Sequence, residues 1–157
     1  MQIPFLAWLL QGIPESIAVA AFVFSMDLGV FSWNKVLKVG FIQAIVIYVV
    51  RLLPFTPGVH VLVLITSLAL VSMFVGRFDF KKAASYSAII ISFVVIFEVV
   101  FFGLLSGYIS FKDMNENVWM RILFTYPQVI AVFLLAVLVR KQGLNRKFDK
   151  IFRSPEI

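Results

Sequence analysis

The chain of 157 residues contains no cysteine and only one histidine, His60. The absence of cysteine excludes disulfide bonds, thiolate metal sites and cysteine nucleophiles. A single histidine makes a poor metal site unless acidic ligands join it, so we expect neither a metal nor another cofactor. Charge is also scarce, because only 14% of the residues are charged, against about 25% in ordinary soluble domains.

Apolar residues make up 62% of the chain, and five runs approach or exceed the ~20 residues that a helix needs to cross a bilayer. The first run lacks a basic leader and contains Glu15, so we expect it to stay as a helix rather than be cleaved as a signal peptide. We predict an all-α, polytopic bundle of five transmembrane helices in the cell membrane (residues 1–139), followed by a short basic tail (residues 140–157). The predicted spans are Ile3–Phe24, Val36–Leu53, Val59–Val75, Ala83–Leu105 and Val118–Val139.

The basic residues are distributed unevenly between the two sides that this five-helix arrangement creates. Cytoplasmic loops collect lysine and arginine, which predicts an external N-terminus and a cytoplasmic C-terminus. The predicted outer side holds only Arg51, Lys112 and Arg121. The predicted cytoplasmic side holds Lys35, Lys38, Arg77, Lys81, Lys82, Arg140, Lys141, Arg146, Lys147, Lys150 and Arg153.

The basic tail contains apolar residues at helical spacing, such as Leu144 and Phe148, among its cations. We therefore expect Arg146, Lys147 and Lys150 to contact the anionic inner leaflet of the lipid bilayer. The alternative is that these cations act only as an ordinary positive-inside signal. We expect no nucleic-acid partner, because no separate fold remains to present a basic patch.

The second and third runs are joined by Pro54, Phe55, Thr56, Pro57 and Gly58. Proline and glycine at such spacing are typical of a tight turn. The two helices are therefore expected to form an antiparallel hairpin, with Pro54, Pro57 and Gly58 in the turn.

Polar side chains within the runs mark one face of the first helix. Gln11 and Glu15 are four residues apart, so both project from the same face. Pro14 removes the backbone hydrogen bond to the carbonyl of Leu10, which predicts a kink. A charge near the centre of a lipid-facing helix costs about 3 kcal/mol or more, so we expect it to face a partner or a cavity.

The second run has a comparable polar face. Gln43, Ile47 and Arg51 share this face, and Gly40 and Ala44 offer a small-residue contact to a neighbouring helix.

The fourth and fifth runs repeat this pattern. Pro127 and Gln128 combine a proline with an amide, as the first run does. One face of the fourth run carries Ser87, Ile91, Val94 and Glu98. We therefore predict a polar cavity in the outer half of the bundle. Its predicted lining is Gln11, Pro14, Glu15, Gln43, Arg51, His60, Glu98 and Gln128.

A purely structural role is the alternative for each of these groups. Polar contacts between membrane helices average only ~0.6 kcal/mol, a small gain for burying a charge, which favours a functional role for Glu15 and Glu98. Arg51 lies near the end of its run, where its long side chain can reach the interface. The more specific alternative is that Arg51 forms an ion pair with Glu15 or Glu98. His60 follows the turn, where a lone histidine can titrate near neutral pH but is more often a polar cap.

No catalytic motif is present in the sequence. Ser106 is the one serine at a membrane edge that a hydrolase could use, and no recognisable motif surrounds it. Paired intramembrane aspartates are excluded, because the aspartates fall in loops or the tail: Asp27, Asp79, Asp113 and Asp149. We therefore expect a protein that is not an enzyme.

Three short motifs carry a resemblance to a known class of membrane module. These are Gln11-Gly12-Ile13-Pro14-Glu15 in the first run, and Arg51-Leu52-Leu53-Pro54 with Pro57-Gly58-Val59-His60 after the second. The first half of the chain resembles small sensory or regulatory membrane modules of Gram-positive bacteria, some of which precede the ATPase part of peptide-sensing histidine kinases. The resemblance implies recognition of a ligand at the outer face. The 17 residues that follow Arg140 hold no phosphoacceptor helix and no ATP-binding domain, so a membrane or cytoplasmic protein partner is expected to supply any catalytic output.

Two functions follow from these expectations. The first is a non-enzymatic membrane sensor or regulatory subunit that takes part in bacterial signalling through a partner protein. The second is a small transporter or transporter subunit that uses intramembrane carboxylates to bind a proton or a cationic substrate. Transport by so small a chain calls for oligomerisation, and a GxxxG pattern at Gly103 and Gly107 leaves a homo-oligomer open.

Overall fold

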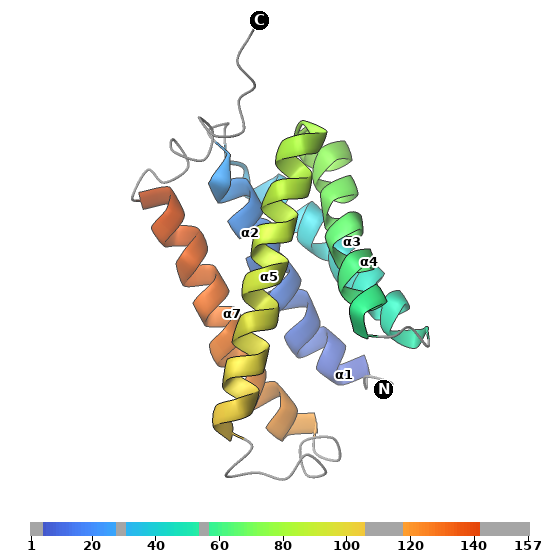
Figure 1. Cartoon of the computed structure of the whole chain (residues 1–157), viewed down its shortest axis with the longest axis vertical. Helices are drawn as coiled ribbons and strands as arrows, with labels where there is room; N and C mark the ends of the chain where they lie inside the picture. The colour runs from blue at the N-terminus through green and yellow to red at the C-terminus, as the bar shows by residue number, and fades with distance from the viewer. Residues whose placement is uncertain (1–4, 28–30, 54–56, 106–117, 142–157) are drawn as a thin grey trace, which may run out of the picture.

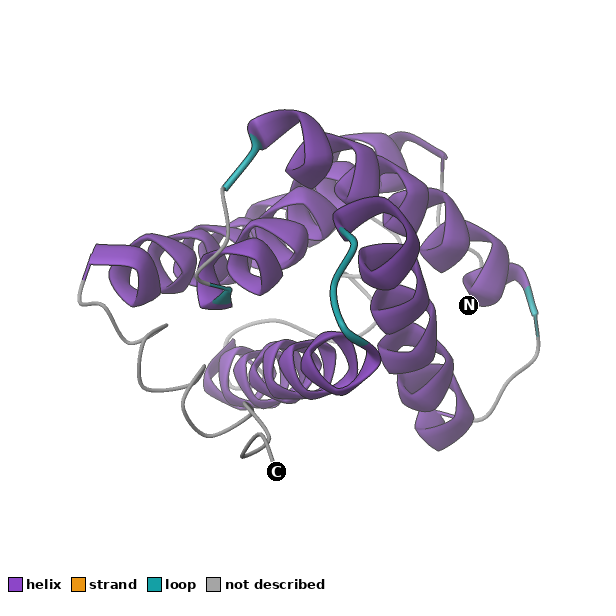
Figure 2. Ribbon diagram, turned by 90° about the horizontal axis from the view of Figure 1, so that it is seen from above, coloured by secondary structure: helices purple, strands orange, loops and turns teal. Residues whose placement is uncertain are grey.

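A computed structural model of the chain describes residues 5–27, 31–53, 57–105 and 118–141, and every regular element in these ranges is a helix (Figures 1 and 2). Because α1, η1 and α2 follow one another without a break, as do α4 and η2, the described part forms five helical segments. The elements are α1 (Phe5–Ala7), the π-helical turn η1 (Trp8–Gly12), α2 (Ile13–Met26), α3 (Trp33–Leu52), α4 (Pro57–Val71), the π-helical turn η2 (Ser72–Gly76), α5 (Phe80–Leu105) and α7 (Val118–Lys141).

Three of the described helical stretches are long and apolar enough to cross a membrane, namely Trp8–Met26, Gly58–Gly76 and Phe80–Phe101. Their outward surfaces include large apolar side chains, such as Phe74, which is 74% exposed. Exposed apolar surface of this kind is typical of a protein that contacts lipid. The predicted all-α fold is thus confirmed for the described residues, and three of the five predicted spans have the length and composition of membrane helices.

The core of the bundle is built around α2. This helix contacts α3, α5 and α7, and α7 packs on one side of it with α3 on the other (Figure 1). Every residue of α2 from Ala18 to Met26 is buried. The side chains that close the core beside it include Val36, Val39, Leu68, Tyr86 and Ile90.

A close contact fixes α2 against α3. A methyl group added at Gly40 would lie only 2.8 Å from the Cα atom of Ile17, so a small residue is needed for the two backbones to approach this closely. Trp8 adds a second link by donating a hydrogen bond from Nε1 to the carbonyl of Ala44 at 2.8 Å. The two small residues of α3 thus both lie at the contact with the first helical segment.

The irregularity expected in the first run takes the form of a π-helical turn. This turn, η1, ends at Gly12, and Pro14 follows within the first turn of α2. Proline cannot donate to the carbonyl of Leu10, and the hydroxyl of Tyr126 on α7 donates to this carbonyl instead, at 3.2 Å. The carbonyl that proline releases therefore joins the first helical segment to the last.

The predicted turn between the second and third helices is wrong in one respect. Pro57 and Gly58 are the first two residues of α4 rather than part of the turn, and His60 lies in the first turn of this helix. Proline is well tolerated at the start of a helix, because its missing N–H has no partner within the helix there. Pro54 lies outside the described residues.

Candidate ligand-binding cavity

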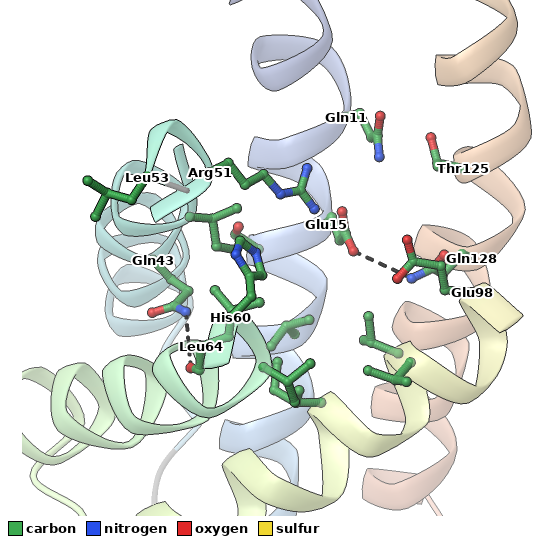
Figure 3. Close-up of a pocket in the computed structure, with 17 residues that line it drawn as sticks. Gln11, Glu15, Gln43, Arg51, Leu53, His60, Leu64, Glu98, Thr125 and Gln128 are labelled. Atoms are coloured by element: carbon green, nitrogen blue, oxygen red, sulfur yellow. Dashed lines mark hydrogen bonds between the residues drawn. The ribbon is translucent and has the colours of Figure 1, made fainter. Parts of the chain in front are cut away.

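A partly open cavity of about 440 Å³ lies between α2, α3, α4, α5 and α7 (Figure 3). It occupies the end of the bundle where α3 ends and α4 begins, and its volume is in the range of small-molecule sites. Its polar lining is Gln11, Glu15, Ser16, Gln43, Arg51, His60, Glu98, Thr125 and Gln128. Its apolar lining is Val19, Ile47, Leu53, Val61, Leu64, Ile91, Val94 and Val95.

The first helical segment contributes a buried amide and a carboxylate to the cavity. Gln11 is only 6% exposed at the end of η1. Glu15 lies one turn further along and accepts a hydrogen bond on Oε1 from Nε2 of Gln128, at 3.5 Å. Because Gln128 belongs to α7, this contact joins two helices across one wall of the cavity (Figure 3).

Gln43 occupies the opposite wall and is 1% exposed. Its Nε2 donates to Oγ of Ser67 at 3.1 Å and lies 3.4 Å from the carbonyl oxygen of Leu64. These contacts orient the amide, yet within the described part of the chain its buried Oε1 has no hydrogen-bond partner. An unsatisfied buried acceptor costs about 1–3 kcal/mol, which a donor group from water or a ligand would relieve.

The charged side chains of the cavity come from opposite walls. Arg51 extends from the end of α3 towards Glu15, and His60 lies beside it at the start of α4 (Figure 3). Glu98 reaches the cavity from α5, next to Gln128 (Figure 3). One wall, from α3 and α4, is therefore basic, and the facing wall, from α2, α5 and α7, is acidic.

The structure brings together seven of the eight side chains that the sequence assigns to a polar cavity. The exception is Pro14, which is not in the lining. It precedes Glu15 by one residue, and a step of one residue turns the side chain about 100° around a helix. The pairing of Glu15 with Arg51 stays a prediction. The predicted membrane-surface residues Arg146, Lys147 and Lys150 lie outside the described part of the chain.

Sequence reasoning misses two hydroxyl groups in the lining. Ser16 donates to the carbonyl of Gly12 at 2.8 Å, so its hydroxyl is held against its own helix. Thr125 donates to the carbonyl of Ile122 at 3.1 Å. Thr125 precedes Gln128 by three residues, so helical spacing alone would place both on one face.

Among the described residues, no group of three or more histidine or acidic side chains lies close enough together to hold a metal ion. Glu15, His60 and Glu98 line the same cavity but do not form such a group. No protein-family model, curated protein or solved structure matches this chain. The cavity's own geometry therefore carries the functional argument.

Proposed function

We propose that this protein is a non-enzymatic membrane sensor or regulatory subunit that binds a small zwitterionic molecule in the polar cavity. The observation that carries the proposal is the separation of charge between the two walls. The Arg51 guanidinium has five N–H donors, enough to bind a ligand carboxylate while it also faces Glu15. Glu98 on the opposite wall is placed to accept hydrogen bonds from a ligand ammonium group. An amino acid or a short peptide carries both a carboxylate and an ammonium group within one small molecule.

We place all five helical segments across the membrane, with the cavity facing outwards. Among the described helices and loops, two cations belong to the cavity end, Arg51 near the end of α3 and Arg121 near the start of α7. Seven belong to the opposite end: Lys35, Lys38, Arg77, Lys81, Lys82, Arg140 and Lys141. The positive-inside rule favours a cytoplasmic location for that end, and α3 with 20 residues and α7 with 24 have the length to span.

Packing beyond the cavity favours sensing over transport. The core towards the opposite end is closed by large side chains that are fully buried, among them Met26, Leu68, Tyr86 and Ile90. A substrate crossing the bundle would have to displace them. A sensor needs only to bind at the outer end and to shift the contacts of its helices with a partner, which agrees with the resemblance to sensory membrane modules.

The test compares three molecules that share one apolar group but differ in charge: leucine, 3-methylbutylamine and 4-methylpentanoate. We expect leucine at saturating concentration to raise the thermal unfolding midpoint of the purified protein by roughly 5 °C. The amine and the acid should have much smaller effects, because each leaves one wall of the cavity without its opposite charge. The measurement is thermal unfolding in detergent.

Two variants and a control define the site in this assay. Arg51→Gln and Glu98→Gln should each remove the response to leucine. Lys38→Gln, an exposed cation outside the cavity, should retain it. Equal responses to all three molecules, or no response to amino acids and short peptides, would rule out a zwitterion. Uptake of leucine into proteoliposomes that contain only this protein would instead establish transport.

A further inference from the structure

A second groove, of about 360 Å³, lies at the opposite end of the bundle from the polar cavity. It is formed where α2 ends, α3 begins and α7 ends. Its lining includes Ser25 of α2, Phe31 just before α3, Trp33 at the start of α3, and Phe133 and Arg140 of α7. None of these residues lines the polar cavity.

The floor and walls of this groove are apolar. Ala21 and Ala136 are buried beneath it. The hydroxyl of Ser25 donates to the carbonyl of Ala21 at 2.7 Å, which satisfies its donor within the helix. Trp33 and Phe133 stack with their ring centroids 6.3 Å apart, and both are well exposed, at 51% and 40%. Such a surface suits a hydrocarbon chain.

The rim of the groove is cationic. The Cζ atom of Arg140 lies 4.3 Å from the centroid of the Phe31 ring, so a cation–π contact fixes the guanidinium at this position. Lys141 lies beside it in the lining. The helix α3 starts at the same place, and the side chain of Ser32 does not cap its first N–H groups. These N–H groups and the two cations together favour an anion.

We propose that this groove binds one anionic phospholipid, with the phosphate at Arg140, Lys141 and the start of α3, and one acyl chain over Phe133 and Trp33. A soluble anion would leave the aromatic surface uncovered, and a lipid without net charge would not match the two cations. The site lies at the end of the bundle that we place at the cytoplasmic leaflet of the membrane, where anionic lipids are enriched. It does not depend on whether the polar cavity binds a ligand.

The test measures lipid retention by native mass spectrometry of the full-length protein, extracted in mild detergent and given phosphatidylglycerol or phosphatidylcholine with identical acyl chains. Each cation near an anionic lipid contributes roughly a fivefold preference. We therefore expect phosphatidylglycerol to bind on the order of thirtyfold more tightly than phosphatidylcholine. Inorganic phosphate at equal concentration should not displace it, because phosphate alone gains nothing from the apolar groove.

A matched pair of double variants locates the site. Arg140→Gln with Lys141→Gln should abolish the preference. Lys38→Gln with Lys81→Gln removes the same charge from exposed positions at the same end, outside the groove, and should preserve it. Arg140→Lys keeps the charge and should retain most of the preference. Equal binding of the two lipids, equal losses in both double variants, or displacement by phosphate would overturn the proposal.

Discussion

Replacing Gly40 with leucine is expected to destabilise the bundle by about 3 kcal/mol or more, at the upper end of the range for an overpacked core. Even a methyl group at this position would lie 2.8 Å from the Cα atom of Ile17 and 3.1 Å from its backbone nitrogen. Backbone atoms cannot rotate away as the end of a side chain can, so α2 and α3 would have to separate. The measurement is the free energy of unfolding of the purified protein in detergent.

Gly103→Leu is the matched control for this substitution. Gly103 lies in α5, and among the described residues a methyl group added there would meet no atom within 4 Å beyond its chain neighbours and its own helix backbone. The same change in chemistry should therefore leave the free energy of unfolding unaltered or raise it slightly, since glycine is a poor helix former. Similar stabilities for the two variants would show that the contact between α2 and α3 is not tight.

The second large effect is expected for the charges that face each other across the cavity. Removing one partner of a buried ion pair leaves the other without compensation and costs about 3–5 kcal/mol. Glu15 and Arg51 are each half-buried, so we expect Glu15→Gln and Arg51→Gln each to cost about 2 kcal/mol, below that range. The double variant should recover much of this loss. The measurement is a double-mutant cycle of the free energy of unfolding.

The substitution at Glu15 is suited to this purpose, because glutamine keeps a carbonyl oxygen to accept the hydrogen bond from Gln128. A second cycle, with Glu98→Gln in place of Glu15→Gln, serves as the comparison. Coupling in the first cycle and near-additive losses in the second are the expected outcome. Additive losses for Glu15 and Arg51 would refute their pairing, and coupling with Glu98 alone would assign the ion pair to α5.

Much of the cavity can be predicted from the sequence because helical spacing is a local property. Gln43, Ile47 and Arg51 repeat every four residues, and all three line the cavity. The prediction for the face of α5 is less complete. Of the residues on this face, Ile91, Val94 and Glu98 line the cavity. Ser87, further along the helix, is fully buried in the core. Spacing identifies a face but does not say how far along the helix a cavity extends.

Contacts between helices cannot be predicted in this way. The hydrogen bond from Tyr126 to the carbonyl of Leu10 joins residues 116 positions apart. Gln43 directs its amide N–H groups to α4, although its sequence context suggests only a polar face. The start of α4 at Pro57 is not evident either, because proline is common both in turns and in the first turn of a helix. Each of these outcomes depends on the packing of distant segments.

We propose above all that the polar cavity is open to water on the outer side of the membrane. The absence of cysteine allows a direct test, since one introduced cysteine is the only thiol in the protein. Glu98→Cys places the thiol in the cavity lining. Val99→Cys is the control, because Val99 is 66% exposed on the same helix but does not line the cavity.

The measurement is the labelling rate of these two variants by a membrane-impermeant methanethiosulfonate added to intact cells. We expect fast labelling at position 98 and little at position 99, where lipid should cover the thiol. Labelling of Glu98→Cys should also slow when a ligand occupies the cavity. Equal rates at the two positions, or no labelling at position 98 from the outer side, would contradict a water-filled cavity that opens outwards.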